Sequence, residues 1–270
     1  LPSVVVIAVK KIVDGLLNGA GVETLGFEGN GPEVSIFKTV FERTGIYRKH
    51  GQTWQLAPPQ SQNPANLGPT WDTIEEFLQG AGSAERKLSE LVARLEDRPY
   101  GLKSGIVPLL VWSVLIFHRD SVCLYYDGTY IRNWDIEIFD LSTKVPEKFS
   151  IRWVVAEQLA KTIVGGLSSV LLKDRPKGQK VGVNTVLYGL FDWYRTLPEY
   201  SRQTNDVSQE ASNLRKAITS SADPIDLMFT AIPKSLGLEP FIHSKTGDPR
   251  TRVSTARTGE LTKRFGQAIT

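Results

Sequence analysis

The sequence is nearly free of sulfur: Cys123 and Met228 are its only cysteine and methionine. A single cysteine excludes an internal disulfide, which fits a reducing compartment such as the cytoplasm. The three histidines, His50, His118 and His243, are far apart, and neither Cys-x-x-Cys nor His-x-x-x-His occurs. Because these are the usual zinc-ligand spacings, we expect no metal site.

No segment is apolar for long enough to cross a bilayer, which takes roughly 20 helical residues. The strongest apolar run, 105–117, is better explained as a buried core helix. Residues 1–9 are apolar but follow no basic stretch, so they do not match a secretory signal. We therefore predict a cytoplasmic protein without membrane contact. Because the chain begins with Leu1 and ends on a basic stretch, we expect it to be a piece of a longer protein.

Recognisable catalytic motifs are also missing. A phosphate-binding loop needs G-x-x-x-x-G-K-[ST], and the sequence has no Gly-Lys-Ser or Gly-Lys-Thr. The nearest glycine-rich stretch, around Gly26, Gly29 and Gly31, is interpreted as a turn before a helix. Cys123 lies in an apolar predicted strand and is interpreted as a packed side chain rather than a nucleophile. We predict no catalytic residue and no cofactor in this segment, and whether the chain belongs to an enzyme stays open.

The composition is that of an ordinary globular protein, with 41% hydrophobic and 23% charged residues among 270. This length suggests one large or two ordinary domains. The formal net charge is +3, and residues 241–270 hold six basic against two acidic side chains. Such a basic end is typical either of a contact with nucleic acid or an acidic partner, or of a solvated connector.

Apolar spacing predicts the elements of the first half. We expect a helix at 3–18, a helix from Pro32, and short strands at 46–49 and 52–56. Further on we expect helices near 71–78, 88–95 and 104–118 and strands at 122–126 and 129–134. Asp127-Gly128 between the last two strands is typical of a type I′ hairpin turn. Three helices followed by a hairpin is the order of elements in a winged helix. Residues 32–56, with one helix and a hairpin, repeat this order in shortened form.

In the second half we expect a short helix at 134–144, a short strand or extended piece at 149–153, and helices at 155–173, 183–194, 207–218 and 223–237. For the last of these we expect Asp223 as N-cap, Pro224 at the first helical position and Gly237 as C-cap. The predicted fold is mainly α with short β-hairpins: tandem winged-helix-like modules followed by a helical bundle. We predict a helix with a partial winged-helix-like module at 1–69 and a full winged-helix-like module at 70–153. The helical bundle follows at 154–241, and a basic connector or tail at 242–270.

Nucleic-acid contact is the one binding activity that the residues suggest. A groove-reading helix needs Arg, Lys, Asn or Gln on its outer face, whereas 105–117 has none of them. We therefore expect another domain to bury this helix. The remaining basic candidates form two groups, one beside the first hairpin turn and one in a loop between two predicted helices. The second group could instead be an ordinary solvated loop that binds nothing. These candidates are Arg48, Lys49, Lys173, Arg175, Lys177 and Lys180.

Several strings together resemble one family. They lie at 25–33, 98–110, 124–130, 146–149, 195–198 and 233–241. The more specific ones are Pro99-Tyr-Gly-Leu102 and Tyr125-Tyr-Asp-Gly128. The chain resembles the middle of very large bacterial P-loop ATPases of phage-defence loci, similar to the BREX ATPase and its phage-growth-limitation relatives.

The resemblance implies a parent ATPase that acts on or near DNA, with ATP and Mg²⁺ bound outside this segment. It carries no catalytic residue onto any position here. We therefore predict a non-catalytic scaffold or regulatory segment that links the motor to DNA or to other subunits of a defence complex. The alternative prediction is a stand-alone winged-helix DNA-binding regulator, and a cryptic enzyme is a third hypothesis.

Overall fold

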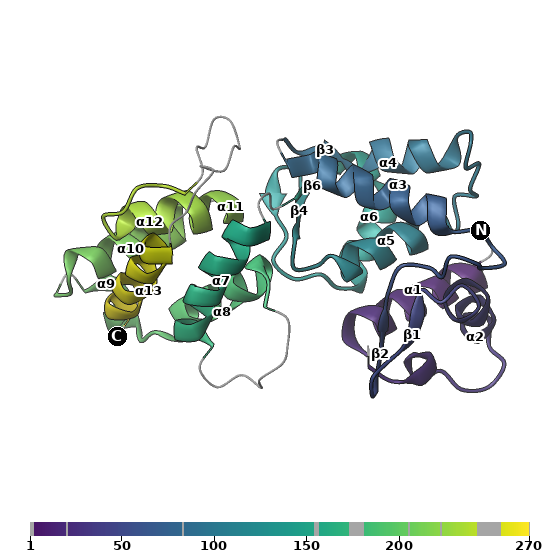
Figure 1. The fold of residues 1–270 in the computed structure, drawn as a ribbon, viewed down its shortest axis with the longest axis horizontal. Coiled ribbons are helices and arrows are strands. Elements are labelled where there is room, and N and C mark those ends of the chain that lie inside the picture. Colours follow the sequence, from purple (N-terminus) through teal and green to yellow (C-terminus); the bar gives the residue numbers. More distant parts are fainter. Residues whose placement is uncertain are drawn as a thin grey trace. The chain divides into compact units, whose positions relative to one another are not determined.

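The computed structural model describes residues 3–19, 21–82, 84–153, 157–172, 181–204, 206–221, 223–241 and 255–269. The chain is mainly helical with two small antiparallel sheets (Figure 1), which confirms the predicted fold class at this level. None of the helices described is long and apolar enough to cross a membrane. The chain divides into two compact units: unit 1 comprises 1–81, 86–118 and 133–151, and unit 2 comprises 82–85, 119–132 and 152–270.

The helices and strands up to residue 153 alternate. In order they are α1 (Ser3–Asn18), η1 (Glu23–Gly26), α2 (Pro32–Phe37), η2 (Lys38–Glu42), β1 (Tyr47–His50), β2 (Thr53–Leu56), α3 (Gly68–Gln79), η3 (Gly80–Gly82), β3 (Arg86–Lys87), α4 (Leu88–Glu96), α5 (Val107–Phe117), β4 (Val122–Tyr126), β5 (Thr129–Tyr130), α6 (Ile136–Lys144), η4 (Pro146–Lys148) and β6 (Phe149–Trp153). The helix predicted at 3–18 and the strand predicted at 149–153 are confirmed to the residue.

The rest of the chain is helical. Its elements are α7 (Glu157–Leu171), α8 (Val183–Thr196), α9 (Glu199–Gln203), α10 (Gln209–Ser220), α11 (Pro224–Asp226), η5 (Leu227–Ala231), α12 (Ile232–Ser235) and α13 (Thr255–Ile269). The last of these lies in the segment that we had expected to be a basic connector or tail. Its Leu261 and Phe265 are buried, so this stretch is a packed helix rather than a solvated tail.

Unit 1 is built around α5. Eight of its eleven residues are buried, and α1, α3 and α4 pack on it. Trp112 is 1% exposed, donates its indole N–H to Ser142 Oγ at 3.0 Å, and meets Trp134 and Phe139 edge to face. The apolar helix is therefore buried by elements of its own unit, where we had expected another domain to cover it.

The β1–β2 and β4–β5 hairpins each close through a tight turn. Asp127 (φ 46°) and Gly128 (φ 76°) both have positive φ, as the predicted type I′ turn requires. In the β1–β2 hairpin the turn falls at Gly51-Gln52, one residue later than predicted, and Gly51 takes the positive φ of 65°. β1 and β2 form one sheet, and the second sheet has the order β3-β6-β4-β5.

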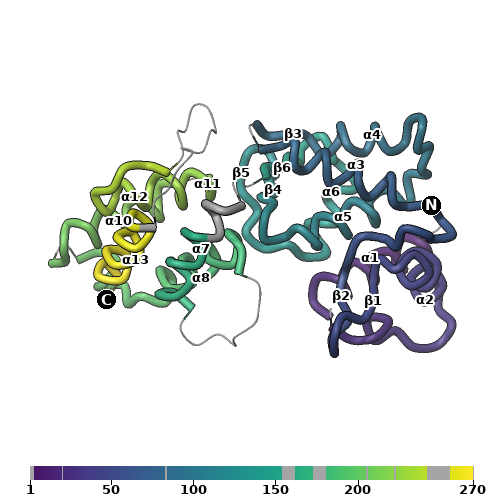
Figure 2. Tube along the Cα trace, in the orientation of Figure 1, coloured from purple at the N-terminus to yellow at the C-terminus, as the bar shows by residue number. Residues whose placement is uncertain are grey.

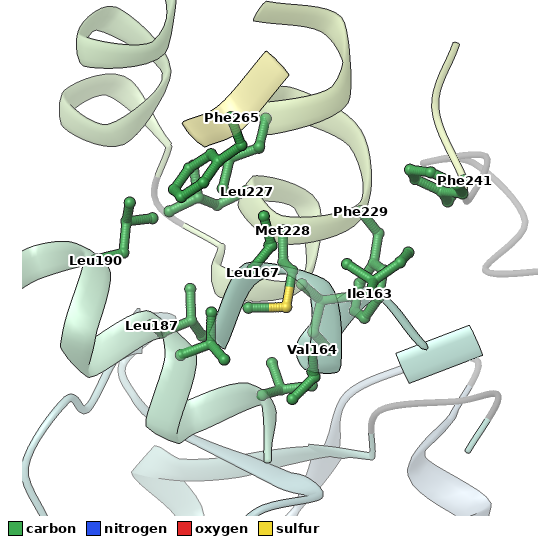
Figure 3. Packing of buried hydrophobic residues seen from close by; sticks show 14 of the residues in the cluster. Ile163, Val164, Leu167, Leu187, Leu190, Leu227, Met228, Phe229, Phe241 and Phe265 are labelled. Carbon is green, nitrogen blue, oxygen red and sulfur yellow. The ribbon is translucent and has the colours of Figure 1, made fainter. Parts of the chain in front are cut away.

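Unit 2 has one apolar core, to which α7, α8, α10, η5, α12 and α13 contribute (Figure 3). Labelled in the figure are Ile163, Val164, Leu167, Leu187, Leu190, Leu227, Met228, Phe229, Phe241 and Phe265. Asp223 caps α11 and Pro224 takes its first position, as predicted. Gly237 follows α12 with φ 71°, and the Leu238 N–H donates to Pro233 O at 2.9 Å, which completes the predicted C-cap.

Candidate functional site

The first pair of predicted nucleic-acid-binding residues lies on the β1–β2 hairpin. Arg48 is half-buried, and its Nη1 donates to the carbonyls of Gly45 and Pro58, each at 2.7 Å. Lys49 is exposed and pairs across the hairpin with Trp54. One nitrogen of Arg48 therefore ties the hairpin to its flanking chain, and Lys49 is free to reach a ligand. The other four candidates, Lys173, Arg175, Lys177 and Lys180, lie outside the described residues.

The glycine-rich stretch forms a helix start, as expected. Gly31 caps α2 through its carbonyl, which accepts the Val34 N–H at 3.1 Å. The Glu33 carboxylate lies against this start, 2.9 Å from where a Cβ on Gly31 would be, and pairs with Lys11 Nζ at 2.9 Å. The hydrogen bond from Lys11 lowers the pKa of Glu33. An anionic side chain thus already occupies the place that a phosphate would take at this helix.

His118 directly follows the last residue of α5 and is partly buried. Its Nε2 lies 2.7 Å from Glu75 Oε1, which also accepts the Trp71 indole N–H at 2.9 Å. This arrangement joins the end of α5 to α3. His50 is exposed next to the first hairpin turn, and His243 lies outside the described residues. No group of three His, Cys, Asp or Glu side chains suited to a metal ion occurs in the described part of the chain.

The densest polar cluster joins the β4–β5 hairpin to α8 within unit 2. The buried Asn184 side chain donates to Arg119 O at 2.6 Å and to Val122 O at 2.8 Å. Its Oδ1 accepts from Tyr130 OH at 2.9 Å and lies 3.7 Å from Cys123 Sγ. We had not predicted this cluster, because Asn184 is more than fifty positions away from each of its partners in the sequence.

A second part of this cluster contains an ion pair. Asp223 pairs with Arg152, accepts from Tyr125 OH at 3.3 Å, and caps α11 through the Ile225 N–H at 2.7 Å. Arg152 Nε is buried and has no hydrogen-bond partner among the described residues. The pair joins the end of β6 to the start of α11, so its geometry is that of a structural clamp.

Around Asn184 the cluster consists of neutral, hydrogen-bonded groups. Burial, with a smaller effect of the Asp223 charge, raises the pKa of the Cys123 thiol, so it stays protonated at neutral pH. Burial likewise raises the pKa of Tyr130. A protonated buried thiol is a poor nucleophile. The cluster therefore holds the hairpin on α8, and Cys123 is the packed side chain that we expected.

Comparison of the chain with protein-family models, with curated proteins and with solved structures finds no match.

Proposed function

We propose that the chain is a non-catalytic scaffold or regulatory segment of a large ATPase of bacterial phage defence, and that it links the motor to DNA or to partner subunits. The observation that carries this proposal is the burial of α5 within unit 1. A helix buried to this extent presents no polar face to a DNA groove or a substrate, so in this proposal it has a packing role. The resemblance described above supports the class of the parent protein.

We further propose that 70–153 is a winged-helix-like module, that 32–56 is a shortened version of it, and that 154–241 is a helical bundle. The order α3, α4, α5 followed by the β4–β5 hairpin supports the first assignment. The arrangement departs from the simplest winged helix in two ways. β3 pairs with β6, a strand that follows α6. The β4–β5 hairpin belongs to unit 2, whereas α3, α4 and α5 belong to unit 1. The shared apolar core of α7, α8, α10 and α13 supports the bundle.

ATP turnover by the purified chain tests the non-catalytic part of the proposal. We expect no hydrolysis of Mg-ATP above a protein-free blank, with or without duplex DNA. Glu33, paired with Lys11, and His118, beside Glu75, are titratable side chains at helix ends and serve as the test positions. Turnover that is lost in Glu33→Gln or His118→Gln, while both variants stay folded, would overturn the proposal.

The identity of the parent protein is tested separately, by sequencing the reading frame that flanks the coding region of this chain on both sides. We expect it to encode G-x-x-x-x-G-K-[ST] directly after a strand, because this loop cradles the phosphates of ATP. A frame that contains no such motif would refute the ATPase assignment. It would favour the alternative, a stand-alone winged-helix regulator that binds DNA.

A further inference from the structure

We propose that residues 43–71, which comprise the β1–β2 hairpin, the short segment before it and the connector after it, bind the phosphate backbone of a nucleic acid. This rests on the proposed function, because it names a surface through which the segment would reach DNA. Residues 43–71 contain no Asp or Glu, although the 270-residue chain has 29 of them. The same stretch holds Arg43, Arg48, Lys49 and His50, and the nearest acidic residue before it is Glu42. A stretch of chain that carries cations and no carboxylate of its own favours contact with a polyanion.

The hairpin is two-faced, because successive side chains of a strand point to opposite sides. On one face, Tyr47 and Leu56 are buried, and Trp54 stacks on Tyr47 with ring centroids 6.1 Å apart. Lys49, opposite Trp54, lies on this face towards the turn, where its side chain is exposed. This apolar face holds the hairpin on unit 1. In Figure 2 the strands lie beside α1 and α2, and their turn is at the edge of that unit.

The opposite face carries polar side chains. The register pairs Arg48 with Gln55 and His50 with Thr53, so these four side chains share one side of the ribbon. All except the half-buried Arg48 are exposed. The two bonds of Arg48 Nη1 to backbone carbonyls fix its guanidinium at the base of this face. A fixed guanidinium loses little conformational freedom on binding a phosphate.

The side chains that surround the cations favour a nucleic acid over other anionic partners. Exposed amides accompany them along the hairpin and connector, and amides and hydroxyls are frequent donors to phosphate and sugar. These amides are Gln52, Gln55, Gln60, Gln62 and Asn66. A lipid surface would need exposed apolar side chains beside the basic ones. Between residues 47 and 56 every aliphatic or aromatic residue is buried or half-buried, so a membrane is disfavoured.

A charge-matched pair of double variants tests the proposal. Arg43→Gln/Lys49→Gln removes two exposed cations from the surface, and Arg94→Gln/Lys103→Gln removes two exposed cations elsewhere in unit 1. Binding of fluorescent duplex and single-stranded DNA is measured by anisotropy between about 50 and 200 mM salt. Thermal unfolding of each variant confirms that it is folded.

We expect the hairpin variant to bind more weakly and with a smaller salt dependence. The slope of log K against log salt should fall by about 1.8 on duplex DNA or about 1.4 on single strands, because two phosphate contacts are lost. The control variant should keep the slope and the affinity of the parent chain.

Three results would overturn the proposal. The hairpin variant could keep the full salt slope, or the control could lose as much as the hairpin variant; either result would place DNA on another surface and leave the scaffold function intact. In the third, phosphatidylserine vesicles bind through Arg43 and Lys49 while DNA does not, which would assign the surface to membranes. The ATP-turnover measurement tests the non-catalytic role independently of all three.

Discussion

Asn184 shows how a single side chain can hold two elements together. It uses both amide hydrogens and its oxygen, on partners in the β4–β5 hairpin and in the segment before it. The residue is 3% exposed, so none of these groups could turn to water if the amide were removed. Leaving a buried donor or acceptor without a partner costs about 1–3 kcal/mol.

We therefore expect Asn184→Ala to lower the free energy of unfolding of unit 2 by at least about 2 kcal/mol, since it strands two carbonyls and a phenol. Urea unfolding followed by tryptophan fluorescence measures the change. The control is Asn213→Ala, because Asn213 bonds only to Gln209 on the exposed side of α10. Equal stability of the two variants would contradict the structural role given to Asn184.

Asp140 makes the stability of unit 1 depend on pH. It bonds to Lys10 Nζ at 2.6 Å and to Lys144 Nζ at 2.7 Å, and so joins α6 to α1. These hydrogen bonds, that from Lys10 first, lower the pKa of Asp140 from its ordinary value of 3.8. A carboxyl group with a lowered folded pKa stabilises the protein above its unfolded pKa. That contribution is lost as the pH falls through the folded value.

Accordingly, the parent chain should be more stable than Asp140→Asn at neutral pH. The difference should begin to shrink as the pH falls to about 3.8, the ordinary pKa of the group, and should be lost as the pH falls further through the lowered folded pKa. Asp72→Asn serves as the control, because Asp72 is exposed on α3. Unfolding curves collected across the acidic range provide the comparison. If the difference between the parent and Asp140→Asn persisted unchanged at the lowest pH, Asp140 would not be the source of the effect.

Residue-scale features were predictable when they are local in sequence. Asp127-Gly128, Asp223-Pro224 and Gly237 each act on a backbone only a few residues away. Asn184 is different, because its partners are 54 to 65 positions away and no pattern around it indicates them. Arg48 shows a mixed outcome: its position on a hairpin was foreseen, while its bonds to Gly45 and Pro58 depend on how the chain returns past the strand.

At the scale of elements, the helix α13 is the main addition to the predicted organisation. It packs on α7, where Gly166 faces Thr262 and Thr258. A Cβ on Gly166 would lie 2.2 Å from Thr262 Oγ1, whereas a Cβ on Gly165 would meet nothing within 4 Å. Adjacent glycines on α7 therefore differ in whether they are needed for the close approach of α13.

Substituting each glycine with alanine should have opposite effects. Gly165→Ala should stabilise α7 by up to about 1 kcal/mol, because alanine is the better helix former. Gly166→Ala should destabilise the packing of α13 on α7, because its methyl group overlaps Thr262. Hydrogen exchange of residues 255–269 reports this as faster exchange in Gly166→Ala alone.

A second substitution checks the cause. Gly166→Ala combined with Thr262→Ala removes the atom that the new methyl group meets, so slow exchange of α13 should return. Faster exchange in Gly165→Ala as well, or no recovery in the double variant, would mean that α13 is not held by this crossing.

The physical reason why α13 escaped prediction lies in its composition. Leu261 and Phe265 are four residues apart, as on one face of a helix, but Gly259 and Gly266 interrupt the stretch and lower its helix propensity. Basic residues nearby made a solvated tail equally reasonable. By contrast, α1 has an apolar face with buried Ile12, Val13 and Leu16, and its glycine, Gly15, falls only in the last turn. Its bounds were predicted correctly.

At the scale of the whole molecule, the account depends on α5. Its apolar sequence predicted burial but could not say which elements provide the cover, because an all-round apolar helix has no face that points to a partner. The structure places α1, α3 and α4 around it, within unit 1. The helix that would read a DNA groove in a winged helix is thus a core element here, and any DNA contact has to use other surfaces.

Hydrogen exchange of α5, with and without duplex DNA, tests this claim most directly. We expect the amides of Val107–Phe117 to be among the slowest of unit 1 in the chain alone, because the helix is covered by its own unit. Adding DNA should leave them unchanged. Fast exchange of α5 in the chain alone, followed by protection when DNA is added, would contradict the account.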